Sequence, residues 1–192
     1  MRCLIIFLFA ICFTACQNKD VPARVVEKAV LDDGTYDLRS VPGSEIKRAE
    51  RRGEEGQLLE LGFVKDGIRH GSWTTYDKDG KIPQKIFSYV DGVLNGPYVE
   101  MDDLGRLSVV AGYQDNQLHG PYGKYRIGRP ELTVNYVNGQ PDGVMAKYNY
   151  QKNKLTQEIT YKMGKMDGPF RYYNEEGEMT LEYMYKDDER VE

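Results

Sequence analysis

The chain has 192 residues, and its 30 acidic side chains outnumber its 26 basic ones, for a net charge of −4. Such a balance gives no general attraction to the phosphates of nucleic acid or to an anionic membrane surface, so it argues against a nucleic-acid-binding protein. The sequence also contains 20 glycines and 15 tyrosines, and both recur at regular spacings that predict the fold class.

The N-terminal segment predicts export and lipidation. Residues 4–13 are apolar apart from Cys12, which is too short a run to cross a bilayer and matches the core of a secretory signal peptide. The following residues, Phe13-Thr14-Ala15-Cys16, resemble the bacterial lipobox, whose cysteine is lipidated and becomes the new N-terminus. We therefore expect a lipoprotein signal peptide over residues 1–15. Cys16 would then anchor the protein in the cell envelope, in the outer membrane if the host is Gram-negative. An ordinary signal peptide with a chance cysteine is the alternative.

Residues 16–44 are expected to form a lipidated tether with an irregular N-terminal segment. They fit the repeat described below poorly and contain turn-forming residues such as Pro22 and Pro42-Gly43. One strand around Val25 to Leu31 is expected within the tether, and a short helix over Ala23 to Val30 is the competing prediction. Since the other two cysteines lie in the expected signal peptide, the mature chain would have neither a disulfide nor a thiol nucleophile.

Five glycines follow one another at spacings of 25, 24, 23 and 25 residues: Gly71, Gly96, Gly120, Gly143 and Gly168. A second set lies four residues before each of them: Gly67, Gly92, Asn116, Gly139 and Gly164. Asn is the residue that best tolerates positive φ after Gly, so both sets are predicted to be structural turn residues. If φ alone matters at Asn116, Asn116→Gly should be neutral or stabilising.

Each unit of about 24 residues predicts two short strands and two turns. The strands are rich in Tyr, Val, Ile and Thr, and no window shows a sustained helical period. The sequence therefore predicts an all-β array over residues 45–192, with one imperfect unit followed by five full units. The imperfect unit would place strands at Glu45 to Arg51 and at Gln57 to Val64. The charged run from Lys186 to Arg190 is expected to blunt the edge of the last strand.

Aromatic residues recur at three positions of the unit and would stack into three columns. The first column is Trp73, Tyr98, Tyr122, Met145 and Phe170. The second is Tyr76, Met101, Tyr125, Tyr148 and Tyr173. The third is Val64, Tyr89, Tyr113, Tyr136, Tyr161 and Tyr185. The first two columns are three positions apart, so they occupy opposite faces unless a bulge brings both to one side. The candidate binding face is made of Trp73, Tyr98, Tyr122 and Phe170, and the alternative is that the columns are simply the packing of the sheet.

The pattern Gly-x-Trp-x-x-Tyr-x-x-x-Gly over Gly71 to Gly80 resembles the MORN repeat in its bacterial variant, as do Gly96 to Gly105 and Gly168 to Gly177. The resemblance covers roughly residues 53–185. It implies an elongated, twisted, single-layer antiparallel sheet of consecutive β-hairpins. MORN arrays act as scaffolds, as proposed binders of lipid headgroups and as accessory segments of enzymes, and the bacterial variant is associated with antitoxin-like proteins.

The sequence offers no recognisable catalytic motif. Its only histidines, His70 and His119, share one repeat position with Asn and Asp, which indicates a structural role. No phosphate loop, dinucleotide fingerprint or His-Glu-x-x-His is present, and the turn acids match no Ca²⁺ loop. We expect no enzyme, metal or cofactor, but an envelope-anchored binding or scaffold module whose partner is a protein or, as a second choice, a glycan. The alternatives are a membrane-surface module and an antitoxin-like or immunity-like protein that binds a toxin.

Overall fold

A computed structural model of the chain describes residues 28–191. The expected signal peptide, its cleavage at Cys16 and the first part of the tether lie outside these residues. Within the described range, no helix has both the length and the apolar character needed to cross a membrane.

The described residues form one 15-stranded antiparallel sheet, which confirms the all-β prediction. The strands are β1 (Asp37–Ser40), β2 (Lys47–Arg52), β3 (Leu58–Lys65), β4 (Ile68–Tyr76), β5 (Pro83–Val90), β6 (Val93–Met101), β7 (Leu107–Gln114), β8 (Gln117–Arg126), β9 (Arg129–Val137), β10 (Gln140–Pro141), β11 (Gly143–Asn149), β12 (Lys154–Lys162), β13 (Lys165–Tyr173), β14 (Met179–Lys186) and β15 (Glu189–Arg190). Only η1 (Asp33–Thr35), a 3-10 turn, is helical in this part of the chain.

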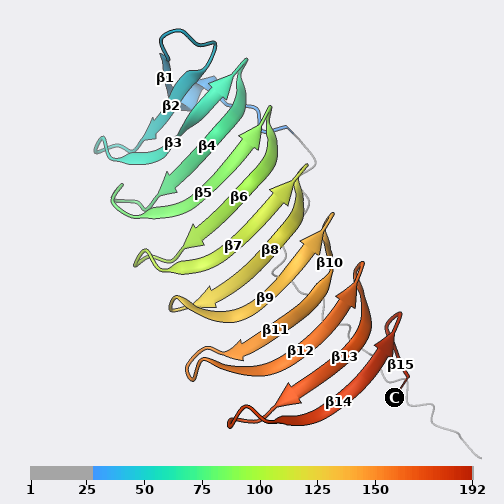
Figure 1. The fold of residues 1–192 in the computed structure, drawn as a ribbon. Coiled ribbons are helices and arrows are strands. Elements are labelled where there is room, and N and C mark those ends of the chain that lie inside the picture. Colours follow the sequence, from blue (N-terminus) through green and yellow to red (C-terminus); the bar gives the residue numbers. More distant parts are fainter. Residues whose placement is uncertain (1–27, 192) are drawn as a thin grey trace, which may run out of the picture.

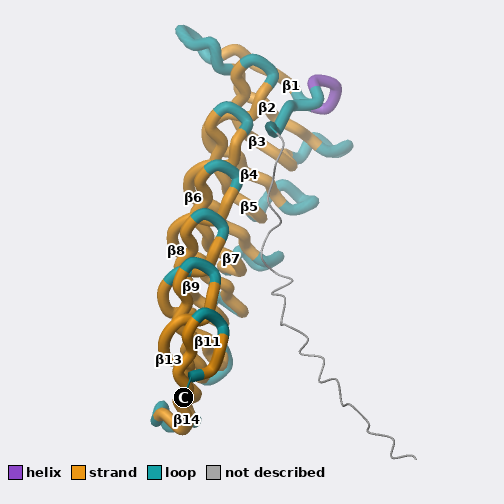
Figure 2. The backbone as a smooth tube through the Cα atoms, turned by 90° about the vertical axis from the view of Figure 1, so that its right-hand side faces the viewer, coloured by secondary structure: helices purple, strands orange, loops and turns teal. Residues whose placement is uncertain are grey.

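Strand order in the sheet follows the sequence, because every strand pairs with the one before it and the one after it, except that the short β10 pairs only with β9. The strands curve strongly, so that successive hairpins form an elongated stack of open hooks (Figures 1 and 2). A single hairpin is marginally stable in water, whereas stacked hairpins share hydrogen-bonded ladders and bury one another's side chains.

The sheet begins earlier in the chain than expected. Strand β2 and strand β3 confirm the two strands of the imperfect unit, but β1 lies inside the segment assigned to the tether and pairs with β2. The boundary at residue 45 was therefore placed too late. Most of the segment for which a strand or a short helix was expected lies outside the described residues. In residues 28–31 there is no helix, and Val30 alone forms a β-bridge, to Ile68. The turn after β1 contains Gly43 with φ of 73°, but this glycine lies outside the repeat spacing, which is why the repeat pattern missed the strand.

The two sets of glycines have different roles. The second set lies in the hairpin turns: Gly67, Gly92, Gly139 and Gly164 have φ from 74° to 88°, and Asn116 has φ of 62°, which confirms the predicted turn conformation. The first set also has positive φ, but its members lie within or at the start of a strand. Gly71 is an example, because β4 continues on both sides of it and the register with β3 shifts between Leu61 and Phe63. The prediction of a turn is thus wrong for this first set, whose members instead bend their strands at β-bulges.

The charged C-terminal run also differs from the expected tail. Asp187 and Asp188 have φ of 50° and 72°, and they turn the chain back so that β15 pairs with β14. A short polar side chain tolerates the left-handed region, so two aspartates can form a turn that glycine forms elsewhere. The sequence pattern missed this turn because it was defined by glycine.

The hairpin turns are linked to one another by backbone hydrogen bonds along one rim of the sheet. In each case the second turn residue donates its N–H to a carbonyl that lies two residues beyond the preceding turn. These bonds are Gly92 to Arg69 at 2.9 Å, Asn116 to Leu94 at 3.0 Å, Gly139 to Leu118 at 2.8 Å, Gly164 to Pro141 at 2.9 Å and Asp188 to Met166 at 3.0 Å.

Asn116 adds a second bond to this rim. Its side chain is 8 % exposed, and its Oδ1 accepts a hydrogen bond of 2.7 Å from the buried N–H of Leu94. Asp188 does the same for the N–H of Met166, at 2.8 Å. Asn116 therefore does more than replace a glycine of positive φ, and the expectation that Asn116→Gly is harmless must be reversed.

Asn116→Gly is expected to lower the free energy of unfolding by about 1–2 kcal/mol, because it leaves the N–H of Leu94 buried without a partner. Asn116→Asp keeps the acceptor and should recover most of the loss. Chemical denaturation of the three proteins measures both effects. A glycine variant at least as stable as the wild type would show that the side-chain bond contributes nothing.

Candidate interaction surface

One face of the sheet, which we call the inner face, carries the hydrophobic core. Its central row crosses the sheet through Ala49, Gly62, Trp73, Phe87, Tyr98, Ala111, Tyr122, Val134, Met145, Ile159, Phe170 and Tyr183. The third column lies beside this row, and Tyr113 and Tyr136 in it are 6 % and 3 % exposed. Burial, with a smaller contribution from Tyr122, raises the pKa of Tyr136 to about 12. A single-layer sheet reaches such burial only where curved strands enclose the side chains.

At two places in the inner row a small residue lies next to large aromatic side chains. Ala111 stands between Tyr98 and Tyr122, which are its register partners on the two neighbouring strands. Gly62 lies under Trp73, so that a Cβ atom added at Gly62 would be only 2.0 Å from the indole ring. This complementarity of volume lets a single layer of side chains fill the space without voids.

The N-terminal segment closes the inner face over Trp73, which is 0 % exposed. The indole Nε1 donates to the carbonyl of Phe63 at 3.0 Å, and the ring of Tyr36 meets the indole edge-on with centroids 5.9 Å apart. The guanidinium of Arg69 lies 4.1 Å from the indole centroid. Glu60 accepts a hydrogen bond of 2.7 Å from the Tyr36 hydroxyl and pairs with Arg69 at 2.9 Å.

The first aromatic column therefore belongs to the core. Trp73 is fully buried and Tyr122 is 6 % exposed, so neither can form a docking surface while the sheet is folded. Tyr98 and Phe170 are half-buried and pack against the same core. The predicted binding face is thus corrected for Trp73 and Tyr122, and the alternative that the column packs the sheet describes them. The sequence could not distinguish the two, because an aromatic residue in a strand suits either environment.

The second aromatic column lies on the opposite face, which we call the outer face. The register shifts just before each of its residues, for example between Lys124 and Tyr125, and the opposite strand provides the extra residue. Along the strand that carries Tyr125, successive side chains still alternate between the two faces. Tyr125 therefore shares the face of Gly123, and its ring lies over this glycine. Likewise, the hydroxyl of Tyr173 donates to Glu158 at 2.6 Å. Each face therefore carries one of the first two columns, which answers the question that the sequence left open.

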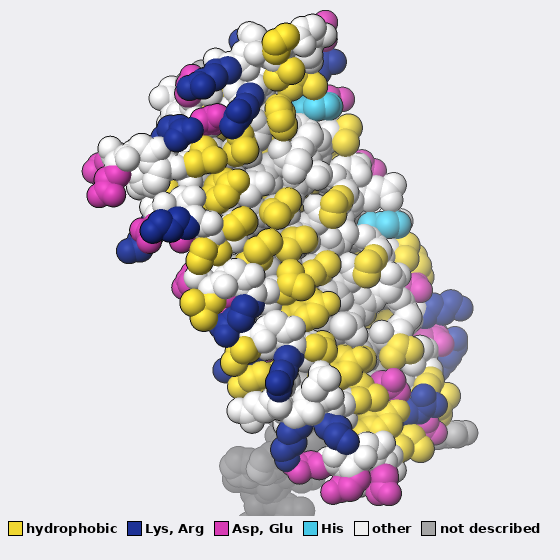
Figure 3. All heavy atoms as spheres, turned by 60° about the vertical axis from the view of Figure 1, so that its left-hand side comes forward, with side chains coloured by type: hydrophobic (Ala, Val, Ile, Leu, Met, Phe, Trp, Pro, Cys, Tyr) yellow, Lys and Arg dark blue, Asp and Glu magenta, His cyan; other side chains and the backbone are white. Residues whose placement is uncertain are grey.

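The outer face has a continuous central row of its own. Direct register partners run across the sheet in the order Asp37, Glu50, Leu61, Thr74, Ile86, Val99, Val110, Gly123, Thr133, Ala146, Glu158, Arg171 and Glu182. The middle of this row is apolar or small, and its two ends are charged. Figure 3 shows the resulting band of hydrophobic side chains, with charged groups beyond it.

We define the outer strip as the central row from Leu61 to Ala146 together with the rows on either side of it. One flanking row is the second aromatic column from Tyr76 to Tyr148. The other includes the exposed side chains of Ser72, Pro97, Pro121, Asn135 and Val144. The repeat pattern did not reveal the central row. Four of its eight residues lie three positions after a strand glycine and four lie on the paired strands, and together they share neither aromaticity nor polarity.

A shallow hollow interrupts the outer strip at Gly123. The hollow measures about 300 Å³ and is lined by residues that include Val110, Tyr125, Thr133 and Val144. Gly123 lines this hollow, and the ring of Tyr125 lies over the glycine at one side of it. Val144 beside it is 51 % exposed, so an apolar side chain is available at its edge.

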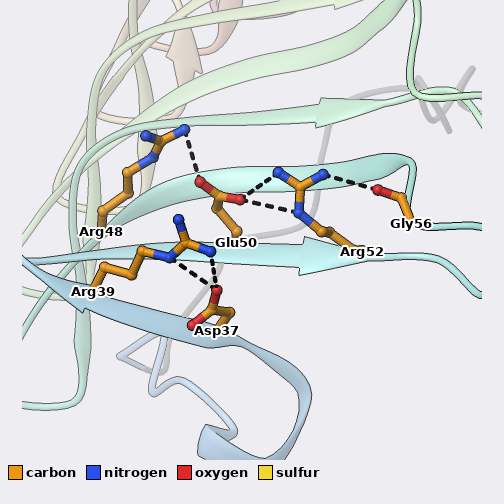
Figure 4. A network of polar contacts seen from close by, with 6 residues as sticks. All are labelled: Asp37, Arg39, Arg48, Glu50, Arg52 and Gly56. Atoms are coloured by element: carbon orange, nitrogen blue, oxygen red, sulfur yellow. Dashed lines mark hydrogen bonds and ion pairs between the residues drawn. The ribbon is translucent and has the colours of Figure 1, made fainter.

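Three arginines surround a buried carboxylate at the N-terminal end of the outer face (Figure 4). Glu50 has a side chain only 3 % exposed, and it pairs with Arg52 at 2.7 Å and with Arg48 at 2.8 Å. The hydrogen bonds from Arg52 hold the pKa of Glu50 below its ordinary value. Arg39, whose side chain is 65 % exposed, pairs with Asp37 at 2.7 Å. These five residues form the basic end cluster, with three positive and two negative charges.

The opposite end of the outer row has the reverse balance. Arg171 pairs with Glu182 at 2.5 Å and with Glu158 at 3.8 Å, so two carboxylates surround one guanidinium. These three residues form the acidic end cluster. Lys162 and the pair of Lys186 with Asp167 lie two rows further along these strands, nearer the hairpin turns.

The two histidines lie on different strands of the sheet. His70 and His119 lie within β4 and β8, next to the bulge glycines, so they are strand residues and not turn residues. The Nδ1 of His70 is 3.4 Å from a carboxylate oxygen of Asp91. Across residues 28–191, no three His, Cys, Asp or Glu side chains are arranged to hold a metal ion.

Comparison with known proteins places the chain in no family, because no family model and no curated protein matches it.

Proposed function

We propose that this protein is a lipid-anchored module of the cell envelope that binds a partner protein through its outer strip and catalyses no reaction itself. The observation that carries the proposal is the outer strip, which stays apolar or small across eight neighbouring strands, β3 to β9 and β11, although the core of the fold is on the other face. The outward face of a one-sided antiparallel sheet is normally polar. An apolar surface of this extent is typical of a protein-binding site.

The proposed anchor rests on the sequence around Cys16, and the proposed scaffold role is supported by the resemblance to MORN arrays. Metabolic labelling with a fatty acid tests the anchor, because Cys16→Ser should remove the label and leave the precursor uncleaved. Absence of label from the wild type would exclude lipidation without affecting the outer strip.

Site-specific photo-cross-linking in cells tests the binding surface. A photoreactive residue replaces Val144, which is 51 % exposed on the outer strip, or Leu104, which is 70 % exposed in a turn outside it. We expect a cross-linked protein adduct at position 144 and none at position 104. A second photoreactive residue at Pro121 should also give an adduct. Val144→Arg should abolish that adduct, because it places a charge in the strip. The same substitution should leave the melting temperature unchanged. Equal adducts at positions 104 and 144 would exclude the strip as the binding site.

A further inference from the structure

We infer that the partner of the outer strip is a second copy of this chain, packed face to face and running in the opposite direction. This inference rests on the proposed function, since it identifies the occupant of the same surface. Two identical surfaces related by a two-fold axis must be complementary to themselves, so that each feature on one side of the axis meets a different feature of the other copy.

The charges of the outer row meet this requirement. The basic end cluster of Asp37, Arg39, Arg48, Glu50 and Arg52 carries a net charge of +1. The acidic end cluster of Glu158, Arg171 and Glu182 carries −1. When a second copy is reversed end to end, the basic cluster of each copy faces the acidic cluster of the other. Two attractive contacts result, whereas a parallel arrangement would place like clusters together.

The position of the apolar residues agrees with the same symmetry. The outer row has thirteen members from Asp37 to Glu182, and Val110 is the seventh, with Gly123 next to it. A two-fold axis that exchanges the two ends must therefore pass close to the hollow at Gly123. With the axis at Val110, Gly123 of each copy faces Val99 of the other, so an apolar side chain meets the hollow.

The available area also fits a stable dimer. Eight strands at about 4.8 Å and three rows along each strand give a strip of about 40 Å by 17 Å, or roughly 700 Å². Stable protein interfaces bury about 800 Å² on each partner. The end clusters extend the strip beyond this estimate, so the surface reaches the size that a specific dimer requires.

A complementary charge reversal tests the inference. Two full-length copies with different affinity tags are co-expressed, solubilised in detergent, and captured through one tag. Arg39→Glu and Glu182→Lys change exposed residues whose ion pairs contribute little to folding stability. We expect wild-type copies to capture each other. Two Arg39→Glu copies, or two Glu182→Lys copies, should capture each other about tenfold less, because both end contacts become repulsive.

Mixing the two variants should restore capture to the wild-type level. In the mixed pair, the altered basic cluster of one copy, now negative, faces the altered acidic cluster of the other, now positive. The other two clusters are unchanged and face each other, so both end contacts are attractive. Glu176→Lys, in an exposed turn away from the strip, is the control and should leave capture unchanged. Absence of capture between wild-type copies, or failure of the mixed pair to recover, would overturn the dimer. If the photo-cross-link at position 144 then yields an adduct with a different protein, the proposed function stands and only the identity of the partner is wrong.

Discussion

Trp73→Ala is expected to lower the free energy of unfolding by about 3–5 kcal/mol, the range found when a buried aromatic side chain is removed from a core. Trp73 has no exposed surface, and its loss removes the contacts with Tyr36 and Arg69 and the hydrogen bond to Phe63. The melting temperature of a domain of this size should fall by roughly 6–20 °C.

Leu104→Ala is the matched control for Trp73→Ala, because Leu104 is 70 % exposed in a turn. This variant should stay within about 0.5 kcal/mol of the wild type. Thermal and denaturant unfolding of both variants check the comparison. If the free energy of unfolding of Trp73→Ala lay within about 1 kcal/mol of the wild-type value, the assignment of the first aromatic column to the core would be wrong.

Gly62→Ala is expected to destabilise the protein by about 3 kcal/mol, at the upper end of the range for overpacking a core. The added methyl group would lie 2.0 Å from the indole of Trp73, and the fully buried indole has no space into which it can move. Gly34→Ala is the control, because its added Cβ would meet only Asp32 Oδ1 at an ordinary distance of 3.6 Å. That variant should be close to neutral.

The double variant gives a sharper result. In the Trp73→Ala background the indole is absent, so Gly62→Ala should cost little or should stabilise by filling part of the cavity. A coupling energy of about 3 kcal/mol between the two positions is therefore expected from a double-mutant cycle. Additive effects would mean that the glycine is required for its backbone and not for the space beneath the indole.

The two ends of the sheet, where the predicted strands were incomplete, show what a repeat pattern can detect. The turn at Asp187 and Asp188 was missed because it contains no glycine. Strand β1 was missed because Gly43 in the turn after it lies outside the repeat spacing. Both nevertheless continue the sheet. A hydrogen-bonded ladder requires only an extended backbone with a free neighbouring edge. Strand pairing at the two ends of a sheet is therefore specified by what lies next to the segment and only weakly by its own residues.

The sequence by itself determined the repeat, the order and approximate bounds of the hairpins, and the left-handed turn residues, because these depend on local backbone preferences of glycine and asparagine. Only the tertiary structure decided which aromatic column is buried. A bulge on one strand shifts which of its side chains share a face with those of the neighbouring strand. The curvature of the whole sheet then decides which of the two faces encloses its side chains. The tertiary structure also revealed the bond from Leu94 to Asn116 and the outer strip, because both join residues of different units that share no sequence pattern.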